Sequence, residues 1–418
     1  MIKKATNTTF TLGIISVINF VLILLISNNL GKGGVSEMGL IVLGISFIVM
    51  LNNLIGGASL VYLVPRKSVS TLLLISYIWS VVSVIFMGTI LYVFELVPMD
   101  FFEFVVIIGF LESLFSINNQ ILLGKQKIGS HNFLKIAQKI IQVIVFLFLG
   151  ISIQNFVISI IVSQFFTLFI SLVLINNFVK FSEIKDIKSS FLVSFKYGFE
   201  IQSSNIVQLL NYRFLYFIIE KNMGSILGIY IVAVQLAESL WIPSKAFAII
   251  QYSEISNEEK ESKRKEISLR FLKISFVVTL ILFGILLLVP NSLFLFLFGK
   301  DITGINPIIL SLGIGIISIA LNQIFAHYLS GKGIYKYNIR ASVLGFIIIL
   351  GLGWLFIDNY GLIGAGLVTS ISYLVSTLYL GYIFIKESET NLKELVITKE
   401  DYIFFRTKIL QKTRNKEK

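Results

Sequence analysis

The sequence predicts an all-α, polytopic membrane protein with twelve transmembrane helices arranged in two six-helix lobes. Three observations predict this fold class: the composition, the length of the apolar blocks and the distribution of basic residues. The 418 residues are 56% hydrophobic and 14% charged, and the mean hydropathy is +0.88. Soluble globular chains are about 45–50% apolar and about 25% charged. The chain therefore has too few polar residues to cover a water-exposed surface.

The apolar residues form blocks of the length that a helix needs to cross a bilayer. A helix that rises about 1.5 Å per residue crosses a hydrocarbon core of about 30 Å in about 20 residues. The blocks are apolar on all sides, whereas a surface helix of a soluble protein is apolar along one stripe. Most breaks between them contain Gly or Pro, which favour turns. We predict spans at 8–30, 38–63, 69–94, 102–123, 133–153, 156–179, 191–219, 225–250, 271–298, 304–329, 338–357 and 361–385.

The basic residues predict the orientation of these spans. With the N-terminus inside, the segments that face inward hold 30 of the 35 Lys and Arg residues, and the outward loops hold Lys32, Lys221 and Lys300. Cytoplasmic loops collect basic residues, so we expect both termini to be cytoplasmic. The net charge of +12 then faces anionic membrane lipids, and it does not require a nucleic-acid partner.

Two similar loops predict an internal duplication. With one single-residue gap, Gly124-Lys125 aligns with Gly331-Lys332 and Asn132 aligns with Asn338, and the two Gly-Lys pairs are 207 residues apart. Two six-helix lobes around a central axis are typical of transporters that expose a cavity to each side in turn. We predict an N-terminal lobe at 1–180, a cytoplasmic linker at 181–190, a C-terminal lobe at 191–385 and a basic cytoplasmic tail at 386–418.

Polar side chains inside the spans are the candidate substrate-binding residues, because hydrocarbon tolerates them poorly. At 100° per residue, each of three helices gathers several of them on one face. Arg213 lies on the far side of its helix, near Gln202, and stands out because its guanidinium is always charged and binds phosphate bidentately. The candidates are Glu112 and Asn119 on 102–123; Glu200, Gln208, Asn211 and Arg213 on 191–219; and Gln235, Glu238 and Lys245 on 225–250.

Structural roles for the same residues remain open at this point. Asn and Gln within helix bundles often form interhelical hydrogen bonds worth about 0.6 kcal/mol. Glu238 and Lys245 are able to form a structural pair, and the long side chain of Lys245 is able to extend to the inner membrane surface.

Several chemistries are disfavoured by what the sequence lacks. It contains no Gly-rich phosphate-binding loop of the P-loop type, so we do not expect a self-contained ATPase. With two His and no Cys, a metal site or a Cys/His nucleophile is not expected either. We therefore predict a protein that is not an enzyme, with no catalytic residues, no bound metal and no cofactor.

Three short motifs resemble those of a known transporter family. Asn29-Leu30-Gly31, followed by Met38-Gly39-Leu40, resembles the turn after the first helix of bacterial polysaccharide flippases. Leu210-Asn211-Tyr212-Arg213, followed by Gly228-Ile229-Tyr230, resembles the hairpin of their seventh and eighth helices. Tyr360-Gly361-Leu362-Ile363-Gly364-Ala365-Gly366 resembles the entry to their last helix. The chain thus resembles the polysaccharide (Wzx-type) flippases of the multidrug/oligosaccharidyl-lipid/polysaccharide exporter superfamily.

The resemblance implies a function and a location. It implies a flippase that moves an undecaprenyl-diphosphate-linked oligosaccharide across the bacterial cytoplasmic (inner) membrane, for O-antigen (lipopolysaccharide), capsule or exopolysaccharide synthesis. It also implies a polysaccharide polymerase and a chain-length regulator as candidate partners, and it leaves open whether a coupling ion, H⁺ or Na⁺, takes part.

Three other functions remain open from the sequence. The first is an ion-coupled exporter of drugs or organic cations on the same fold, although residues 1–30 contain no acidic side chain. The second is a glycan polymerase or ligase, which is expected to need a long outward loop. The third is a scaffold subunit of an export complex.

Overall fold

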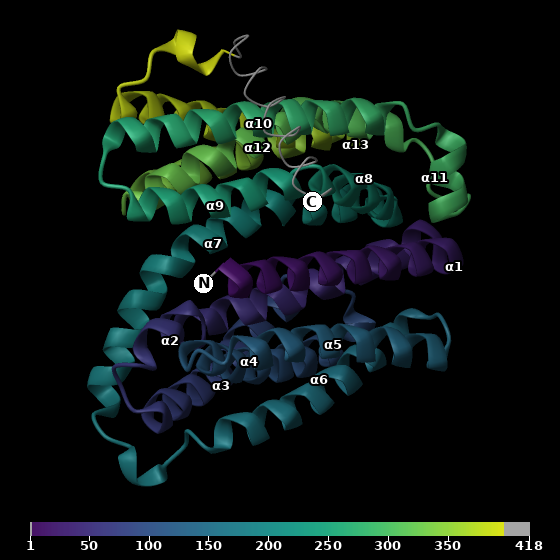
Figure 1. The fold of residues 1–418 in the computed structure, drawn as a ribbon. Helices are drawn as coiled ribbons and strands as arrows, with labels where there is room; N and C mark the ends of the chain where they lie inside the picture. The colour runs from purple at the N-terminus through teal and green to yellow at the C-terminus, as the bar shows by residue number, and fades with distance from the viewer. Residues whose placement is uncertain (1, 397–418) are drawn as a thin grey trace, which may run out of the picture. The chain divides into compact units, whose positions relative to one another are not determined.

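The computed structural model describes the backbone of residues 2–396, and the side chains of these residues except 2–10, 12, 181, 200, 201, 204 and 253. In this part of the chain every regular element is helical and none is a β-strand (Figure 1). The helices are α1 (Ile2–Gly56), α2 (Ala58–Leu63), α3 (Val69–Val93), α4 (Phe102–Gly124), α5 (Ile128–Leu149), α6 (Ile153–Asn176), α7 (Ile187–Met223), α8 (Leu227–Ser239), α9 (Ile242–Asn257), α10 (Glu261–Leu287), α11 (Asn291–Phe298), α12 (Ile305–Gly331) and α13 (Lys336–Ser388). Short 3₁₀ segments occupy Met99–Phe101, Phe181–Glu183, Gly224–Ile226 and Leu392–Leu395. The predicted all-α class is confirmed.

The two longest helices, α1 and α13, are each interrupted at one glycine. Gly31 has φ 63° and ψ −160°, and Gly361 has φ 57° and ψ −136°. Side chains with a Cβ atom rarely adopt such positive φ angles, so glycine allows the turn. Figure 1 shows the chain running out along the first half of α1 and returning along the second half to α2. The predicted loop at 31–37 is therefore a turn at a single residue.

The helices provide twelve membrane-crossing segments. Eight helical stretches among the described residues are long and apolar enough to cross a bilayer. Two of them, Gly13–Leu63 and Lys336–Ser388, have 51 and 53 residues, which is enough for two crossings each. The stretch Asn205–Ser239 contains the second half of α7 and all of α8, so α7 provides one crossing and α8 with α9 provides another. Five stretches cross once each, and α4 supplies the last of the twelve segments. The chain is a multi-pass membrane protein, as predicted.

Two predicted spans differ from the observed helices. The span predicted at 225–250 is divided into α8 and α9, because Pro243 stands in the first turn of α9 and cannot continue a helix from the preceding turn. The span predicted at 271–298 begins ten residues earlier, at Glu261. The stretch Glu261–Arg270 was expected to be a loop because it is charged, but Lys, Glu and Arg are good helix formers.

Two hydrogen bonds recur at the spacing of the predicted repeat, which itself stays a prediction. His131 Nδ1 lies 3.1 Å from the carbonyl oxygen of Asn119, and Asn338 Nδ2 donates to the carbonyl oxygen of Ala326 at 3.1 Å. Both members of the second pair lie 207 residues after those of the first. The correspondence therefore needs no gap, and it pairs His131, rather than Asn132, with Asn338. Each bond ties the start of one helix to the end of the preceding helix.

Packing divides the described chain into two compact units. Unit 1 comprises the residues up to Gln235 together with Pro290–Ile305, and unit 2 comprises Leu236–Val289 and the residues from Asn306 onward. This division falls after α8 because α7 packs against α1, α2 and α3. The lobe boundary at 181–190 stays a prediction from the sequence. Residues 397–418 of the predicted basic tail lie outside the described part.

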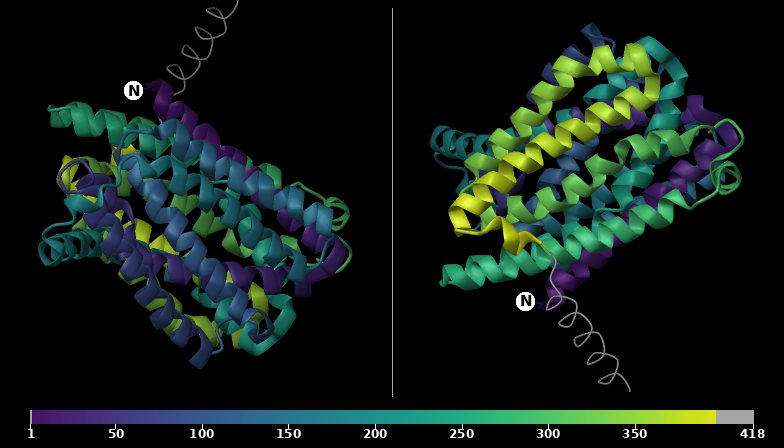
Figure 2. Two further views of the ribbon diagram at one scale, coloured as in Figure 1. Left: turned by 90° about the horizontal axis from the view of Figure 1, so that it is seen from below. Right: turned by 90° about the horizontal axis from the view of Figure 1, so that it is seen from above.

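Within unit 1, α4, α5 and α6 pack against one another, and Figures 1 and 2 show them as a group of neighbouring helices. The second half of α1 packs against α3 and α4. These contacts bring α1, α4, α5 and α6 together in unit 1, where their polar side chains line the cavity described below.

Candidate functional site

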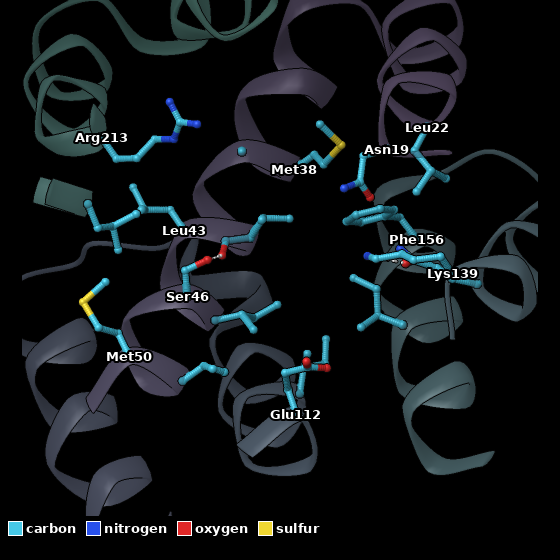
Figure 3. A pocket seen from close by; sticks show the side chains of 18 of the residues that line it. Asn19, Leu22, Met38, Leu43, Ser46, Met50, Glu112, Lys139, Phe156 and Arg213 are labelled. Carbon is cyan, nitrogen blue, oxygen red and sulfur yellow. Dashed lines mark hydrogen bonds between the residues drawn. The ribbon is translucent and has the colours of Figure 1, made fainter. Parts of the chain in front are cut away.

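Unit 1 contains a cavity of about 590 Å³, shown in Figure 3. Its lining residues come from α1, α4, α5, α6, α7 and α8 and all belong to unit 1. Half of the 28 lining residues have a polar or charged side chain, and eight of these are carboxamides. The polar lining residues are Asn19, Ser46, Asn53, Glu112, Gln138, Lys139, Gln142, Ser163, Gln164, Gln202, Asn205, Arg213, Tyr216 and Gln235.

The cavity lies near the middle of the helices that form it. Glu112 is ten residues after the first residue of α4 and twelve before the last. Lys139 is eleven residues after the first residue of α5 and ten before the last. At 1.5 Å per residue, each lies about 15–18 Å of helix from either end. In a hydrocarbon core about 30 Å thick, this is close to the bilayer midplane.

Glu112 is the centre of a hydrogen-bond cluster on α4, α5 and α6. Gln138 Nε2 donates to its Oε2 at 2.7 Å, and Gln164 Nε2 donates to the same atom at 2.9 Å. Lys139 interacts electrostatically with the carboxylate and donates to Gln142 Oε1 at 3.0 Å. Carboxamide donors and a nearby cation stabilise a carboxylate away from bulk water. Lys135, one turn before Lys139 on the same helix, also interacts electrostatically with Glu112.

The helix α7 forms another wall of the cavity, and Arg213 is the positively charged residue of that wall. Its guanidinium carbon lies 5.2 Å from the centre of the Tyr216 ring, within the range of a cation–π contact. Gln202 and Asn205, hydrogen-bonded to each other, line the cavity from the same helix. Figure 3 shows Arg213 on one side of the cavity, and Lys139 and Phe156 on the other.

Two lining carboxamides have an oxygen that accepts no hydrogen bond within the described structure. Gln164 is 3% exposed, and its Oε1 is buried and unpartnered. Asn53 Oδ1 is likewise buried without a partner. An unsatisfied buried polar atom costs about 1–3 kcal/mol. Both atoms have almost no accessible surface, so they are unsatisfied acceptors within the wall of the cavity.

The predicted site residues separate into groups. Arg213, Glu112 and Gln235 line the cavity, whereas Asn119, Gln208 and Asn211 belong to unit 1 but are not among the lining residues. Glu238 and Lys245 belong to unit 2 and do not line the cavity either. The side chain of Glu200 lies outside the described residues.

The cavity-facing side of α7 is opposite to the predicted stripe. The prediction grouped Gln208 and Asn211 with Glu200, and placed Arg213 on the far side near Gln202. The structure lines the cavity with that far side, from Gln202 to Tyr216. Gln208 instead donates to the hydroxyl of Tyr212 on its own helix, at 2.7 Å.

The predicted common face of Gln235, Glu238 and Lys245 is also corrected. The break between α8 and α9 falls between Glu238 and Lys245, so the regular 100° spacing does not continue across it. Gln235 lines the cavity, whereas Lys245 is exposed.

Asn119 is 2% exposed, and neither polar atom of its side chain has a hydrogen-bond partner in the described structure. Asn119 lies about one turn before the C-terminal end of α4, whereas Glu112 lies near the middle of that helix. Its backbone carbonyl, rather than its side chain, makes the contact with His131.

Lys139 is the main residue that the sequence reasoning missed: it falls within the predicted span 133–153 but is not among the candidate residues. In the structure α5 begins at Ile128, so Lys139 lies well inside it. A usable signal was present: Lys135, Gln138, Lys139 and Gln142 have the i, i+3, i+4, i+7 spacing of one helix face.

Comparisons with known proteins identify the fold. No protein-family model matches the sequence, and no curated protein sequence matches it. Among solved structures, the lipid II flippase MurJ in an inward closed conformation superposes with a TM-score of 0.72 at 17% identity, over 94% of this chain and 89% of that one. An inward-facing multidrug resistance MATE family transporter of the MOP superfamily superposes with a TM-score of 0.71 at 14% identity, over 90% of this chain and 94% of that one.

A MOP superfamily transporter from Pyrococcus furiosus, described as having a binding pocket of reverse polarity, gives a TM-score of 0.67 at 14% identity, over 93% of this chain and 96% of that one. At such low identity the similarity concerns the fold. The chain therefore has the fold of the MOP superfamily transporters.

Proposed function

We propose that this protein is a flippase that moves an undecaprenyl-diphosphate-linked oligosaccharide across the bacterial cytoplasmic membrane by alternating access. The observation that carries the proposal is the cavity at mid-helix level. Among the described side chains that line it, two are cations, Lys139 and Arg213, eight are carboxamides and one is acidic, Glu112. A ligand with an anionic group and many hydroxyls complements this lining.

The physical problem that such a protein solves is the transfer of polar groups through hydrocarbon. An isolated charge moved from water into a medium of low dielectric constant costs tens of kcal/mol by Born estimates. The Arg213 guanidinium is suited to bind phosphate oxygens bidentately, and the carboxamides are able to both donate and accept hydrogen bonds with sugar hydroxyls. The polyprenyl chain has no need of the cavity, since it is soluble in the lipid.

The comparisons support a lipid-linked substrate, because one of the similar structures is the lipid II flippase MurJ. Under this proposal the protein translocates its substrate without making or breaking covalent bonds. It supplies repeat units to a polysaccharide polymerase and chain-length regulator, with H⁺ or Na⁺ as the candidate coupling ion and with both termini in the cytoplasm.

The test is the variant Arg213→Gln, which removes the positive charge from the α7 wall. In cells whose own copy of the gene is deleted, we expect this variant to lose at least about nine-tenths of surface polysaccharide, because a charge-assisted hydrogen bond is worth about 1.5–3 kcal/mol. Lipid-linked oligosaccharide should accumulate in the inner leaflet. Both quantities are measured by electrophoresis of extracted glycans.

The matched control is Lys245→Gln, which removes one positive charge from an exposed position outside the cavity lining. This variant should export polysaccharide at the wild-type level, with equal membrane abundance of both variants on immunoblots. Normal surface polysaccharide with Arg213→Gln, at equal abundance, would sink the proposal.

Export of drugs or organic cations is the second candidate, favoured by the carboxylate of Glu112 in the cavity and by the similarity to a multidrug resistance transporter. A cation exporter requires the negative charge and tolerates loss of Arg213. Glu112→Gln should then abolish resistance to cationic dyes, whereas Arg213→Gln should not. The flippase proposal expects no dye resistance from the wild-type protein.

A further inference from the structure

Two lysines of α5 share one carboxylate in the wall of the cavity that α4, α5 and α6 form. Lys135 and Lys139 lie one turn apart on α5, and both interact electrostatically with Glu112 of α4. Among the residues that the structure describes, no other carboxylate interacts with either lysine. With all three groups charged, this wall therefore contains one more positive than negative charge.

Lys139 is the lysine of this group that faces the cavity. It is partly exposed and lines the cavity, whereas Lys135 is not among the lining residues. Figure 3 shows Lys139 beside Phe156. An ammonium group has three N–H donors. One of them donates to Gln142 Oε1 at 3.0 Å, and the described structure contains no other hydrogen bond from Lys139. Two donors and a share of the excess charge are thus left for a ligand.

Glu112 is held beside the lysines by neutral partners. Gln138 on α5 and Gln164 on α6 both donate to its Oε2, at 2.7 and 2.9 Å. These two hydrogen bonds do not involve an ammonium group, so they hold the carboxylate in place when an anion approaches Lys139. A negative charge fixed there repels a second anion and attracts the ammonium group. Glu112 therefore lowers the affinity of the wall for anions without abolishing its excess of positive charge.

We propose that the wall formed by α4, α5 and α6 binds the diphosphate of the ligand at Lys139, and that Glu112 is an internal counter-ion whose charge is shared between Lys135 and Lys139. This inference rests on the proposed function, since it takes the ligand to be lipid-linked through a diphosphate. A diphosphate carries more than one negative charge, so a second cation in the cavity adds to the contribution of Arg213. The counter-ion keeps the binding weak enough for release after translocation.

The experiment measures the dissociation constant of undecaprenyl diphosphate. The purified full-length protein is placed in nanodiscs of phosphatidylcholine, whose headgroup has no net charge. Lys139→Gln should weaken binding by at least about tenfold, because charge-assisted hydrogen bonds to phosphate are lost. Lys135→Gln should weaken it by about threefold although Lys135 does not line the cavity, because Glu112 then interacts with Lys139 alone. This variant tests the sharing of charge without altering Glu112.

Glu112→Gln is the sharpest variant, because it should improve binding. Its side-chain carbonyl is still able to accept hydrogen bonds from Gln138 and Gln164, but the negative charge beside the two lysines is gone. We expect about tenfold tighter binding of the probe. A distorted cavity would bind more weakly, so the gain distinguishes a counter-ion from a merely structural residue. Lys245→Gln, at an exposed position outside the cavity lining, should leave the constant unchanged.

Each other outcome has a definite meaning. Unchanged or weaker binding by Glu112→Gln overturns the counter-ion, and unchanged binding by Lys139→Gln overturns the anion site. In both cases a loss of binding by Arg213→Gln still supports the proposed function. Phosphatidylglycerol added to the nanodiscs should not displace the probe. Displacement would show that the wall takes lipid phosphates in general, and would overturn the assignment to the diphosphate. If the probe does not bind the wild type, the proposed function itself fails, and the inference fails with it.

Discussion

Gly198 of α7 is a residue at which packing leaves no room for a side chain. A Cβ atom added there would lie 1.6 Å from the carbonyl oxygen of Leu54, so the backbones of α7 and α1 are in direct contact. Small residues permit such close approach between helices in membranes. We expect Gly198→Ala to force these helices apart, at a cost of about 1–3 kcal/mol.

The measurement is the apparent unfolding temperature in detergent, followed by size-exclusion chromatography after heating. Gly284→Ala on α10 is the matched control, because an added Cβ meets no atom within 4 Å there and Ala favours a helix by about 1 kcal/mol over Gly. The control should be unchanged or slightly more stable. An unfolding temperature for Gly198→Ala equal to that of the wild type would contradict the close contact between α1 and α7.

At the same scale, Arg213 is a candidate from the sequence that lines the cavity, and its role in binding stays a prediction; the helix face that meets the cavity was not predicted. Both faces of α7 carry carboxamides, Gln202 and Asn205 on one and Gln208 and Asn211 on the other. Periodicity shows that two residues share a face; it does not show which face meets a cavity. That choice depends on contacts of α7 with helices far away in the sequence.

At the scale of elements, the segment around α11 packs with unit 1 although its sequence neighbours, α10 and α12, lie in unit 2 apart from the first residue of α12. Ser27 donates from its side chain to the carbonyl of Phe298, and Asn28 donates to that of Leu297. The last carbonyls of a helix have no partner within the helix. The polar end of the first half of α1 therefore caps α11.

The packing of the α11 segment on α1 predicts that two introduced cysteines will form a disulfide, and the chain has no natural cysteine to interfere. A Cβ atom built on Gly31 lies 3.4 Å from the Cβ atom of Asp301, close to the mean Cβ–Cβ distance of about 3.8 Å in disulfides. The double variant Gly31→Cys/Asp301→Cys should cross-link under mild oxidation. Peptide mass spectrometry after proteolysis detects the linked peptide, and dithiothreitol should release it.

Each single variant serves as a control, since neither can form the intramolecular bond. Gly31→Cys also reveals how much the positive φ angle at this position destabilises the protein once a side chain is present. If the double variant stays reduced while both single variants are folded, α11 does not dock on α1 as the structure shows.

The sequence predicted which segments form helices better than it predicted the residues at which those helices begin and end. Apolar blocks of the required length are a strong signal, and they predicted the crossing segments. The turn at Gly31 was expected to occupy several residues, because Gly31, Gly33 and Gly34 are all turn formers, and only the first of them leaves the helix. The helix α5 begins at Ile128, five residues before the predicted span, so Lys139 lies at mid-helix rather than near the start.

At the scale of the whole molecule, we predict the orientation in the membrane from the basic residues together with the length of α7. Lys188 lies in the first turn of α7 and Lys221 in the last. They are 33 residues apart, which corresponds to about 50 Å of helix. This exceeds the hydrocarbon thickness of about 30 Å, so the two side chains reach opposite sides of the membrane. The excess of basic residues in alternate segments predicts that Lys188 is cytoplasmic.

The absence of natural cysteine allows this orientation to be tested with single-cysteine variants. Lys188 and Lys221 are both exposed, so Cys at either position is accessible to a maleimide. In intact cells a membrane-impermeant maleimide should label Lys221→Cys and should label Lys188→Cys only after permeabilisation, with the unsubstituted protein as the blank. Lys127→Cys and Lys300→Cys repeat the comparison at the exposed ends of two other hairpins, and should behave as inside and outside positions respectively. The reverse pattern at both pairs would invert the topology, and the substrate would then have to enter the cavity from the opposite leaflet.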